Sequence, residues 1–368
     1  MTLSRRFAPW LISLSIAAVC VLLCAPGLSA QKRKKEEITQ TLQLPRDLPS
    51  AVTGETRRLS FHVTPLSAKG LLSAQVREAL KALAHQTGAS PVLKIRAFVA
   101  GSGDLRRVRD LVSEAFTVRH MPLPALSLIQ AGGLPLEGAQ VVLEAIATEK
   151  KEINPRGLVF LAAPVATSDN PLDPVEPLAA ASLERLQQAL QAAGSKSTDV
   201  VRVTCFLSSL ENVAATRKLV EAAYPHAALN YVQTQRAPQQ ALAACEAVAR
   251  LTRDASARVE YLPAEGDPQA ALVGAAHVVL TGSQVSYGFQ ESNSRLALER
   301  LQKALESNGV TGRDVAFAQY YPLAGSIGAQ VRKLRPEFFP KAVGSVLLFE
   351  GLPGMDAGFA LDAIAAKD

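Results

Sequence analysis

Apolar and polar residues recur along the chain at spacings that predict helices and strands in a fixed order. Within 74–85 the apolar residues recur at helical spacing. Over 92–99 one face is apolar and the other carries Lys94 and Arg96, which predicts a strand with one face packed on helices. A second helix is expected over about 104–116, where apolar residues again follow the helical period.

Two apolar runs then close the unit. Residues 124–146 contain one apolar run, a Gly-Gly-Leu-Pro turn and a second run that carries a single acid, Glu144. This pattern predicts two strands joined by a tight connection. The pattern returns in two later segments, 227–248 with Glu246 and 343–364 with Asp362.

A constant offset relates the second and third occurrences. The sequence Leu-Glu-Arg-Leu-Gln at 183–187 recurs at 298–302, which is 115 positions later. The pairs with the same offset are Gly194 and Gly309, Asp199 and Asp314, and Pro238 and Pro353. Chance matches would not keep one offset across helix, turn and strand, so we interpret the chain as one unit written three times. The first copy aligns less tightly.

Each copy is expected to run strand, helix, strand, helix, strand, strand. This order predicts an α+β fold, a sheet with two helices on one face. The other face of each sheet also needs cover, and three sheets can cover one another by closing around a pseudo-threefold axis. The expected boundaries are a signal peptide at 1–30, a linker at 31–56 and repeats at 57–148, 157–251 and 259–366, with 259–262 as a hairpin partner of the third repeat.

The first thirty residues have the pattern of a secretory leader. Arg5 and Arg6 precede an almost wholly apolar stretch over 11–23, and Ala30 ends a small-residue cleavage site. We therefore expect a periplasmic or secreted protein. The alternative is a membrane anchor that stays uncleaved, which the basic run at 32–35 favours.

Composition excludes several functions. Apolar content of 48% with 20% charged residues is typical of a globular chain. The net charge of +6 is scattered and aromatic residues are only 5%, so no nucleic-acid partner is expected. The histidines form no cluster with metal-ligand spacing, and no cofactor motif is found. Cys205 and Cys245 lie outside the leader, and either a disulfide or two small buried residues would account for them.

Several motifs taken together resemble a known family. They are a helix that ends in Gly and is followed by Asp-Val-Val-x-Val-Thr-x-Phe-Leu, a Tyr-Pro or Phe-Phe-Pro after the second helix, and a final Glu-Ala-Ile-Ala strand. Residues 57–366 resemble the RidA (YjgF) family of reactive imine deaminases, also known as endoribonuclease L-PSP-like. Gly282, Ser283 and Gln284 resemble a Ser-Gly-Gln segment of that family. Its members form homotrimers with ligand clefts between subunits, so the resemblance implies a joined trimer that is monomeric in solution.

The resemblance also implies a degenerate site. The family holds the substrate carboxylate with an arginine, a group that grips carboxylates through two parallel hydrogen bonds. The matching positions here are Leu126, Leu229 and Gly344. The family acid is kept as Glu144, Glu246 and Asp362. Two interpretations stay open for it: a base that positions water in an apolar cleft, or a structural acid bonded to the main chain.

Three hypotheses follow. The first is an exported RidA-like protein without deaminase activity, which binds a small metabolite or a partner in its inter-repeat clefts. The second is a hydrolase or deaminase that acts on a neutral imine, enamine or amide, with a retained acid as base. The third is a structural or partner-binding module of the cell envelope.

Overall fold

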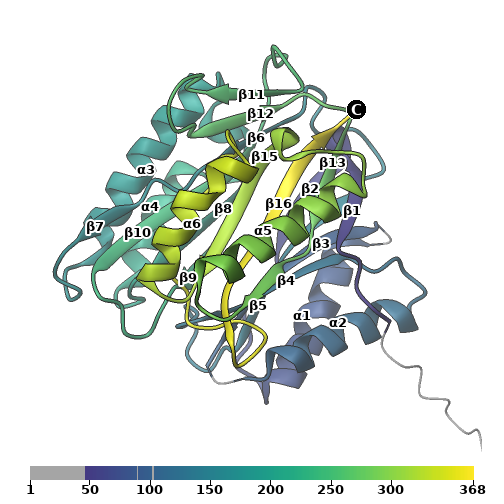
Figure 1. The fold of residues 1–368 in the computed structure, drawn as a ribbon. Coiled ribbons are helices and arrows are strands. Elements are labelled where there is room, and N and C mark those ends of the chain that lie inside the picture. The colour runs from purple at the N-terminus through teal and green to yellow at the C-terminus, as the bar shows by residue number, and fades with distance from the viewer. Residues whose placement is uncertain (1–45, 89, 102) are drawn as a thin grey trace, which may run out of the picture. The chain divides into compact units, whose positions relative to one another are not determined.

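The computed structural model describes residues 46–88, 90–101 and 103–368. Over these residues the chain forms a mixed α+β fold in which helices pack on β-sheets (Figure 1). The predicted leader at 1–30 and the basic run after it lie outside the described residues. Within the described part, no helix combines the length and apolarity needed to cross a membrane.

The first sheet follows the predicted order of elements. They are β2 (Leu59–Val63), α1 (Leu72–Thr87), β3 (Val92–Ala100), α2 (Leu105–Val118), β4 (Ala125–Ala131) and β5 (Val141–Thr148). In the sheet the strand order is β2-β5-β3-β4, and β3 and β4 are parallel. The side chain of Asp104 caps α2 by accepting a hydrogen bond from the Arg106 N–H, which fixes where this helix begins.

The tight strand pair expected over 124–146 is wrong. β3 lies between β4 and β5, so Arg96 of β3 has Ser127 on one side and Glu144 on the other. The Gly-Gly-Leu-Pro segment therefore crosses the end of β3 and is not a hairpin turn. Two apolar runs in sequence are compatible with both arrangements, because either one buries the same strand faces.

The second sheet repeats this arrangement. Its elements are β6 (Leu158–Leu161), β7 (Ala166–Ser168), α3 (Val175–Ala192), the 3-10 turn Ser197–Asp199, β8 (Val200–Leu207), α4 (Val213–Ala223), β9 (Ala228–Gln233) and β10 (Ala241–Arg250). β8 lies between the parallel β9 and the antiparallel β10. Cys205 of β8 and Cys245 of β10 face each other directly and form a buried disulfide, which decides between the two alternatives that the sequence left open.

The third sheet is less regular. Its elements are β13 (His277–Thr281), β14 (Gln284–Tyr287), α5 (Glu291–Glu306), the 3-10 turn Gly312–Asp314, β15 (Val315–Pro322), α6 (Gly325–Phe338) and β16 (Ala357–Lys367). The strand expected from Val343 onward forms only isolated parallel bridges to β15, at Val343 and Val346. Main-chain hydrogen bonds join Val343 to Ala316 and Ala318 of β15, and at Gly344 between these bridges a Cβ would lie 1.7 Å from the Ala318 carbonyl oxygen, so the path there requires glycine.

Two segments join sheets other than the expected ones. β1 (Ala51–Glu55), which precedes the 3-10 turn Thr56–Arg58, pairs with β13 of the third sheet. The expected linker at 31–56 therefore ends in a strand. β11 (Val259–Leu262) pairs with β12 (Ala270–Val273), and β12 pairs with β6, so 259–262 extends the second sheet and not the third. In both cases the strand completes the edge of a sheet built by another part of the chain.

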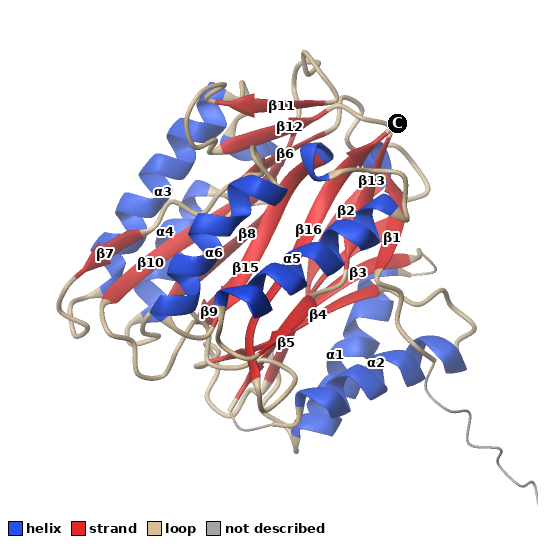
Figure 2. Cartoon of the chain, viewed as in Figure 1, coloured by secondary structure: helices blue, strands red, loops and turns tan. Residues whose placement is uncertain are grey.

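Helices cover one face of each sheet, and the opposite faces meet. Figure 2 shows α5 and α6 in front of β15 and β16, and equivalent helix pairs pack on the other two sheets. The opposite faces contribute to two shared hydrophobic clusters. Members drawn from all three sheets are Phe61, Phe160 and Phe317 in one cluster and Phe98, Phe206 and Tyr321 in the other. The three sheets thus bury one another, and the middles of their strands lie close together.

Candidate functional site

Three clefts lie beside the three positions singled out from the sequence. Leu126 lines a cleft of ≈ 360 Å³, Leu229 one of ≈ 400 Å³ and Gly344 one of ≈ 980 Å³. Each will be called by the name of that residue. The opposite wall of each cleft comes from a different sheet. It is formed by residues that follow β13 in the Leu126 cleft, β2 in the Leu229 cleft and β6 in the Gly344 cleft.

The Leu126 cleft brings together residues predicted separately. Gly282, Ser283 and Gln284 line it opposite Leu126, although they lie in the third sheet. The Ser283 N–H donates a hydrogen bond to the Leu126 carbonyl oxygen at 3.1 Å. The structure thus places these candidate residues, from two different sheets, around one cleft. No described side chain from the acid triplet lines this cleft.

The Leu229 cleft lies between the second sheet and the end of β2. Its walls are largely apolar, and the polar groups are Thr64, Asn230, Tyr231, Arg217 and Glu221. Arg217 lies 5.7 Å over the Tyr231 ring. Because Arg217 and Glu221 have opposite charges, the charged side chains of this cleft balance each other.

The Gly344 cleft is the largest and lies between the second and third sheets. Ala162, Ala163 and Pro164 line it opposite Gly344 and Ser345. The Ser345 hydroxyl donates to the Ala163 carbonyl oxygen and accepts from the Ala163 N–H, both at 3.1 Å, which joins the two walls at the floor. A side chain at 344 would clash with Ala318, so no arginine can stand there without moving the main chain.

An arginine from the second helix of each unit lines each cleft. Arg109 of α2 lines the Leu126 cleft, Arg217 of α4 the Leu229 cleft and Arg332 of α6 the Gly344 cleft. Their offsets of 108 and 115 residues equal those of the strand positions Phe98, Phe206 and Tyr321. These arginines occupy equivalent positions, and the sequence analysis did not identify them.

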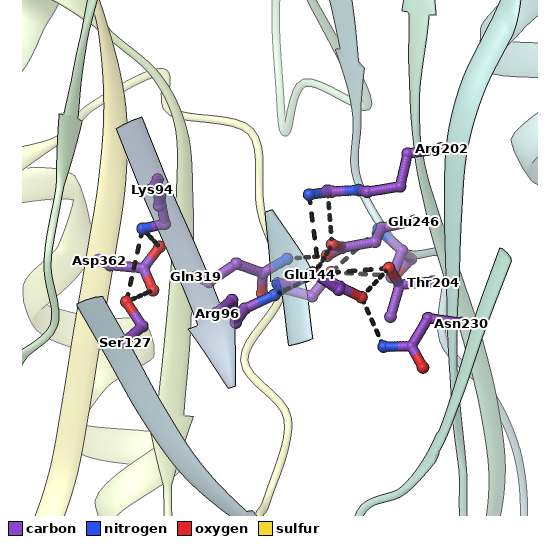
Figure 3. A network of polar contacts seen from close by, with 12 residues as sticks. Lys94, Arg96, Ser127, Glu144, Arg202, Thr204, Asn230, Glu246, Gln319 and Asp362 are labelled. Atoms are coloured by element: carbon purple, nitrogen blue, oxygen red, sulfur yellow. Dashed lines mark hydrogen bonds and ion pairs between the residues drawn. The ribbon is translucent and has the colours of Figure 1, made fainter. Parts of the chain in front are cut away.

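The three acids lie elsewhere, in a buried polar network between the sheets (Figure 3). Asp362 of β16 pairs with Lys94 of β3 at 2.8 Å. It also accepts hydrogen bonds from the hydroxyls of Ser127 at 2.6 Å and Tyr321 at 3.0 Å. Lys94 donates in addition to the Thr281 carbonyl oxygen at 2.6 Å. Both oxygens of Asp362 are thus occupied.

Glu144 and Glu246 share Arg96. The Arg96 guanidinium lies 2.5 Å from a Glu144 oxygen and 2.6 Å from a Glu246 oxygen. The second Glu144 oxygen accepts from Thr204 at 2.6 Å and from Asn230 at 2.7 Å.

Glu246 has two further partners in the network. Arg202 donates to its first oxygen at 2.9 Å, and the Gln319 amide donates to its second. Three basic side chains, Lys94, Arg96 and Arg202, therefore balance the three acids.

This network sets the protonation of its acids. Burial opposes ionisation of Glu144, but attraction by Arg96 and Arg202 outweighs it and holds the pKa of Glu144 below its usual range. Asp362 likewise has a lowered pKa, because Lys94 and Arg96 outweigh the effect of burial. For Glu246 burial prevails over its arginine neighbours and raises the pKa.

Neither environment expected for the acids is found. Glu144, Glu246 and Asp362 do not lie in an apolar cleft, and side chains rather than main-chain groups bind their oxygens. Glu144 sits behind the wall of the Leu229 cleft, which its partner Asn230 lines. The cavity beside the network measures only ≈ 20 Å³, enough for about one water molecule. The structure separates the acids from the clefts, so the two halves of the expected site do not meet.

The family comparison identifies the middle of the chain. The model described as Endoribonuclease L-PSP matches residues 151–262. This segment belongs to the endoribonuclease L-PSP family. The L-PSP segment contains the second sheet from β6 to β11, with Leu229, Glu246 and the disulfide. Membership supports a small-molecule-binding or deaminase-like role.

Solved structures similar to this chain carry related descriptions. A member of the YjgF/YER057c/UK114 family from Mycobacterium tuberculosis is 24% identical, covers 24% of this chain and 79% of its own, and has a TM-score of 0.23. YyfB of the conserved Rid protein family from Yersinia pestis is 15% identical, covers 26% of this chain and 84% of its own, and has a TM-score of 0.25. The YjgF gene product from E. coli is 15% identical, covers 25% of this chain and 81% of its own, and has a TM-score of 0.22. No match was found among curated proteins.

The sequence contains a pattern from which the buried network could have been predicted. Lys94 and Arg96 lie on one face of a predicted strand, and Arg202 lies on the equivalent strand of the next unit. Charged side chains on a strand face that another sheet must cover require buried partners. Glu144, Glu246 and Asp362 are the natural partners, because each is the single acid of the last apolar strand of its unit.

Proposed function

We propose that this chain is a small-molecule-binding protein built from three tandem L-PSP-like units, and that its ligand occupies the Gly344 cleft. On this proposal the protein does not catalyse the imine deamination of the RidA family. One observation carries it: the cleft of ≈ 980 Å³ is open, while Glu144, Glu246 and Asp362 are bound in ion pairs outside the Leu126, Leu229 and Gly344 clefts. A base whose oxygens are already occupied cannot take a proton from a ligand that it does not reach.

The size and lining of the Gly344 cleft support a ligand. Small-molecule sites have volumes of about 300–1,000 Å³ and combine apolar walls with a few polar groups. Here Ala189, Ala192 and Val346 supply apolar surface, while Gln188 and Gln269 supply amides. The cleft therefore offers both contact area and groups that orient a ligand.

The tandem architecture is part of the proposal. The second and third units keep one sequence offset of 115 residues, and all three units share the sheet order first, last and middle strand (β2-β5-β3, β6-β10-β8 and β13-β16-β15) and have equivalent helix arginines. The clefts also follow in a cycle, since the first sheet faces the third, the third faces the second and the second faces the first. These relations support closure around a pseudo-threefold axis. Light scattering on the purified mature chain should give the mass of a monomer, and a stable trimer would contradict this closure.

Export is also proposed. The buried disulfide between Cys205 and Cys245 supports an oxidising compartment, as does the secretory pattern of residues 1–30. N-terminal sequencing of the protein from fractionated cells should find a chain that begins at Gln31 outside the cytoplasm. A full-length chain in the membrane fraction would favour the anchor instead.

A cavity-filling pair of variants tests the binding site. Ala189 lines the Gly344 cleft, whereas Ala180 is an exposed residue of the same helix outside it. A ligand at one hundred times its Kd should stabilise the wild type by about 2.7 kcal/mol. Ala189→Trp should abolish the ligand-induced rise in Tm, and Ala180→Trp should keep it. If both variants respond like the wild type, the ligand binds elsewhere.

A further inference from the structure

The charges of the Gly344 cleft are unequal. Arg185, Arg332 and Arg335 line it, and Asp267 is the one acid among its described lining residues. Asp267 pairs with Arg335 at 3.1 Å. Two guanidinium groups therefore remain without a carboxylate in the described lining. They belong to helices of different sheets, α3 for Arg185 and α6 for Arg332.

Arg332 stands at the position where each unit places an arginine toward its own cleft. It forms no ion pair with any described residue. Its equivalent Arg109 lies 3.4 Å from Asp47, and its equivalent Arg217 shares the lining of the Leu229 cleft with an acid, Glu221. In the Gly344 cleft the acid of the described lining, Asp267, already pairs with Arg335, so the lining offers Arg332 no unpaired carboxylate.

Arg185 is held in place on the other helix. Its guanidinium donates to the carbonyl oxygens of Val165 at 3.1 Å and Ala181 at 3.3 Å. These bonds fix the planar group beside the cleft and occupy only part of its five N–H donors. A guanidinium held in this way loses less conformational entropy when it binds a ligand carboxylate.

We propose that the Gly344 cleft binds an organic dianion, whose two acidic groups divide between Arg332 and Arg185. This inference rests on the proposed function and adds the chemical class of the ligand. A single carboxylate would leave one guanidinium unused, whereas a chain with an acid at each end satisfies both. The volume of ≈ 980 Å³ leaves room for such an extended ligand.

The test uses calorimetry on the full mature chain at constant ionic strength. The probes are succinate, glutarate and adipate, the monocarboxylates of equal chain length, and the three corresponding diamides. At least one dicarboxylate should bind about tenfold more tightly than both its monocarboxylate and its diamide, because one charged hydrogen-bonding pair at a partly exposed site is worth about that factor. Arg332→Gln and Arg185→Gln should each remove about tenfold of this affinity.

Arg300→Gln is the matched control. Arg300 is the residue 115 positions after Arg185, it donates to the Val285 carbonyl oxygen at 3.1 Å as Arg185 does to Val165, and it does not line the Gly344 cleft. Its substitution should leave the affinity unchanged. Equal binding of a diamide, full affinity in Arg332→Gln, or a series without any binder would each overturn the assignment. A neutral ligand that Ala189→Trp excludes would uphold the binding function and overturn only the dianion.

Discussion

Replacement of Lys94 by methionine separates a structural from a catalytic role of the acids. Lys94 is buried, and its ammonium group contacts Asp362 at 2.8 Å and the Thr281 carbonyl oxygen at 2.6 Å. Methionine keeps the apolar stem of the side chain but removes the charge. Asp362 would then retain the Ser127 and Tyr321 hydroxyls as donors and lose the one cation that contacts it among the described residues.

The expected loss is large because the pair is buried. Removal of one partner from a buried ion pair costs about 3–5 kcal/mol, since the remaining charge is left without compensation. A second change, Asp362→Asn, removes that charge while keeping an oxygen for the two hydroxyls. The double variant should therefore be more stable than Lys94→Met alone, although it differs from the wild type at one more position.

Thermal unfolding at neutral and acidic pH is the assay, and Lys333→Met is the control. Lys333 contacts Glu291 at 3.0 Å on the surface, with side chains 69% and 41% exposed, so its loss should cost less than about 1 kcal/mol. The deficit of Lys94→Met should shrink as the pH falls, because protonation neutralises the unpaired Asp362. Equal deficits for the two lysine variants, or a double variant that is less stable than the single one, would refute the reasoning.

Three further outcomes are expected. Replacement of both Cys205 and Cys245 by alanine should lower the free energy of unfolding by about 4 kcal/mol, because the bond closes a loop of 40 residues, and denaturant titration will measure the loss. Glu144 and Asp362 have lowered pKa values in the folded chain, so the stability that they contribute is present above their unfolded pKa of about 4 and is lost as the pH falls. The Tm should therefore decline between pH 7 and pH 3, and it should decline less steeply in Glu144→Gln. Gly344→Ala should lower Tm and weaken ligand binding together, because its Cβ would displace neighbouring main chain at the cleft.

Local periodicity predicted the elements of the fold more readily than their pairing. The helix expected over 74–85 forms α1, and the strand expected over 92–99 forms β3. Their apolar periods report burial directly. The pairing of β1 with β13 joins residues more than two hundred positions apart, and no local pattern specifies such a partner. For the same reason the insertion of β3 between two consecutive strands was missed.

The candidate site was predictable in part. The resemblance singled out Leu126 and, separately, Gly282, Ser283 and Gln284 as binding residues, and the structure places them around one cleft. It also assigned the acids to the clefts, where they are absent. The difference lies in Arg96, whose guanidinium draws Glu144 and Glu246 into one buried network. An alignment with the family identifies which residue stands at each family position. It does not show where a buried acid points, because that depends on cations that distant segments of the chain supply.

A binding role without deamination is tested most directly by ammonia release from freshly generated 2-aminoacrylate. The purified mature chain should leave the reaction at its uncatalysed rate, because Glu144, Glu246 and Asp362 are bound in ion pairs away from the clefts. Catalysed turnover by the wild type that Glu144→Gln abolishes, in a variant that stays folded, would contradict this role.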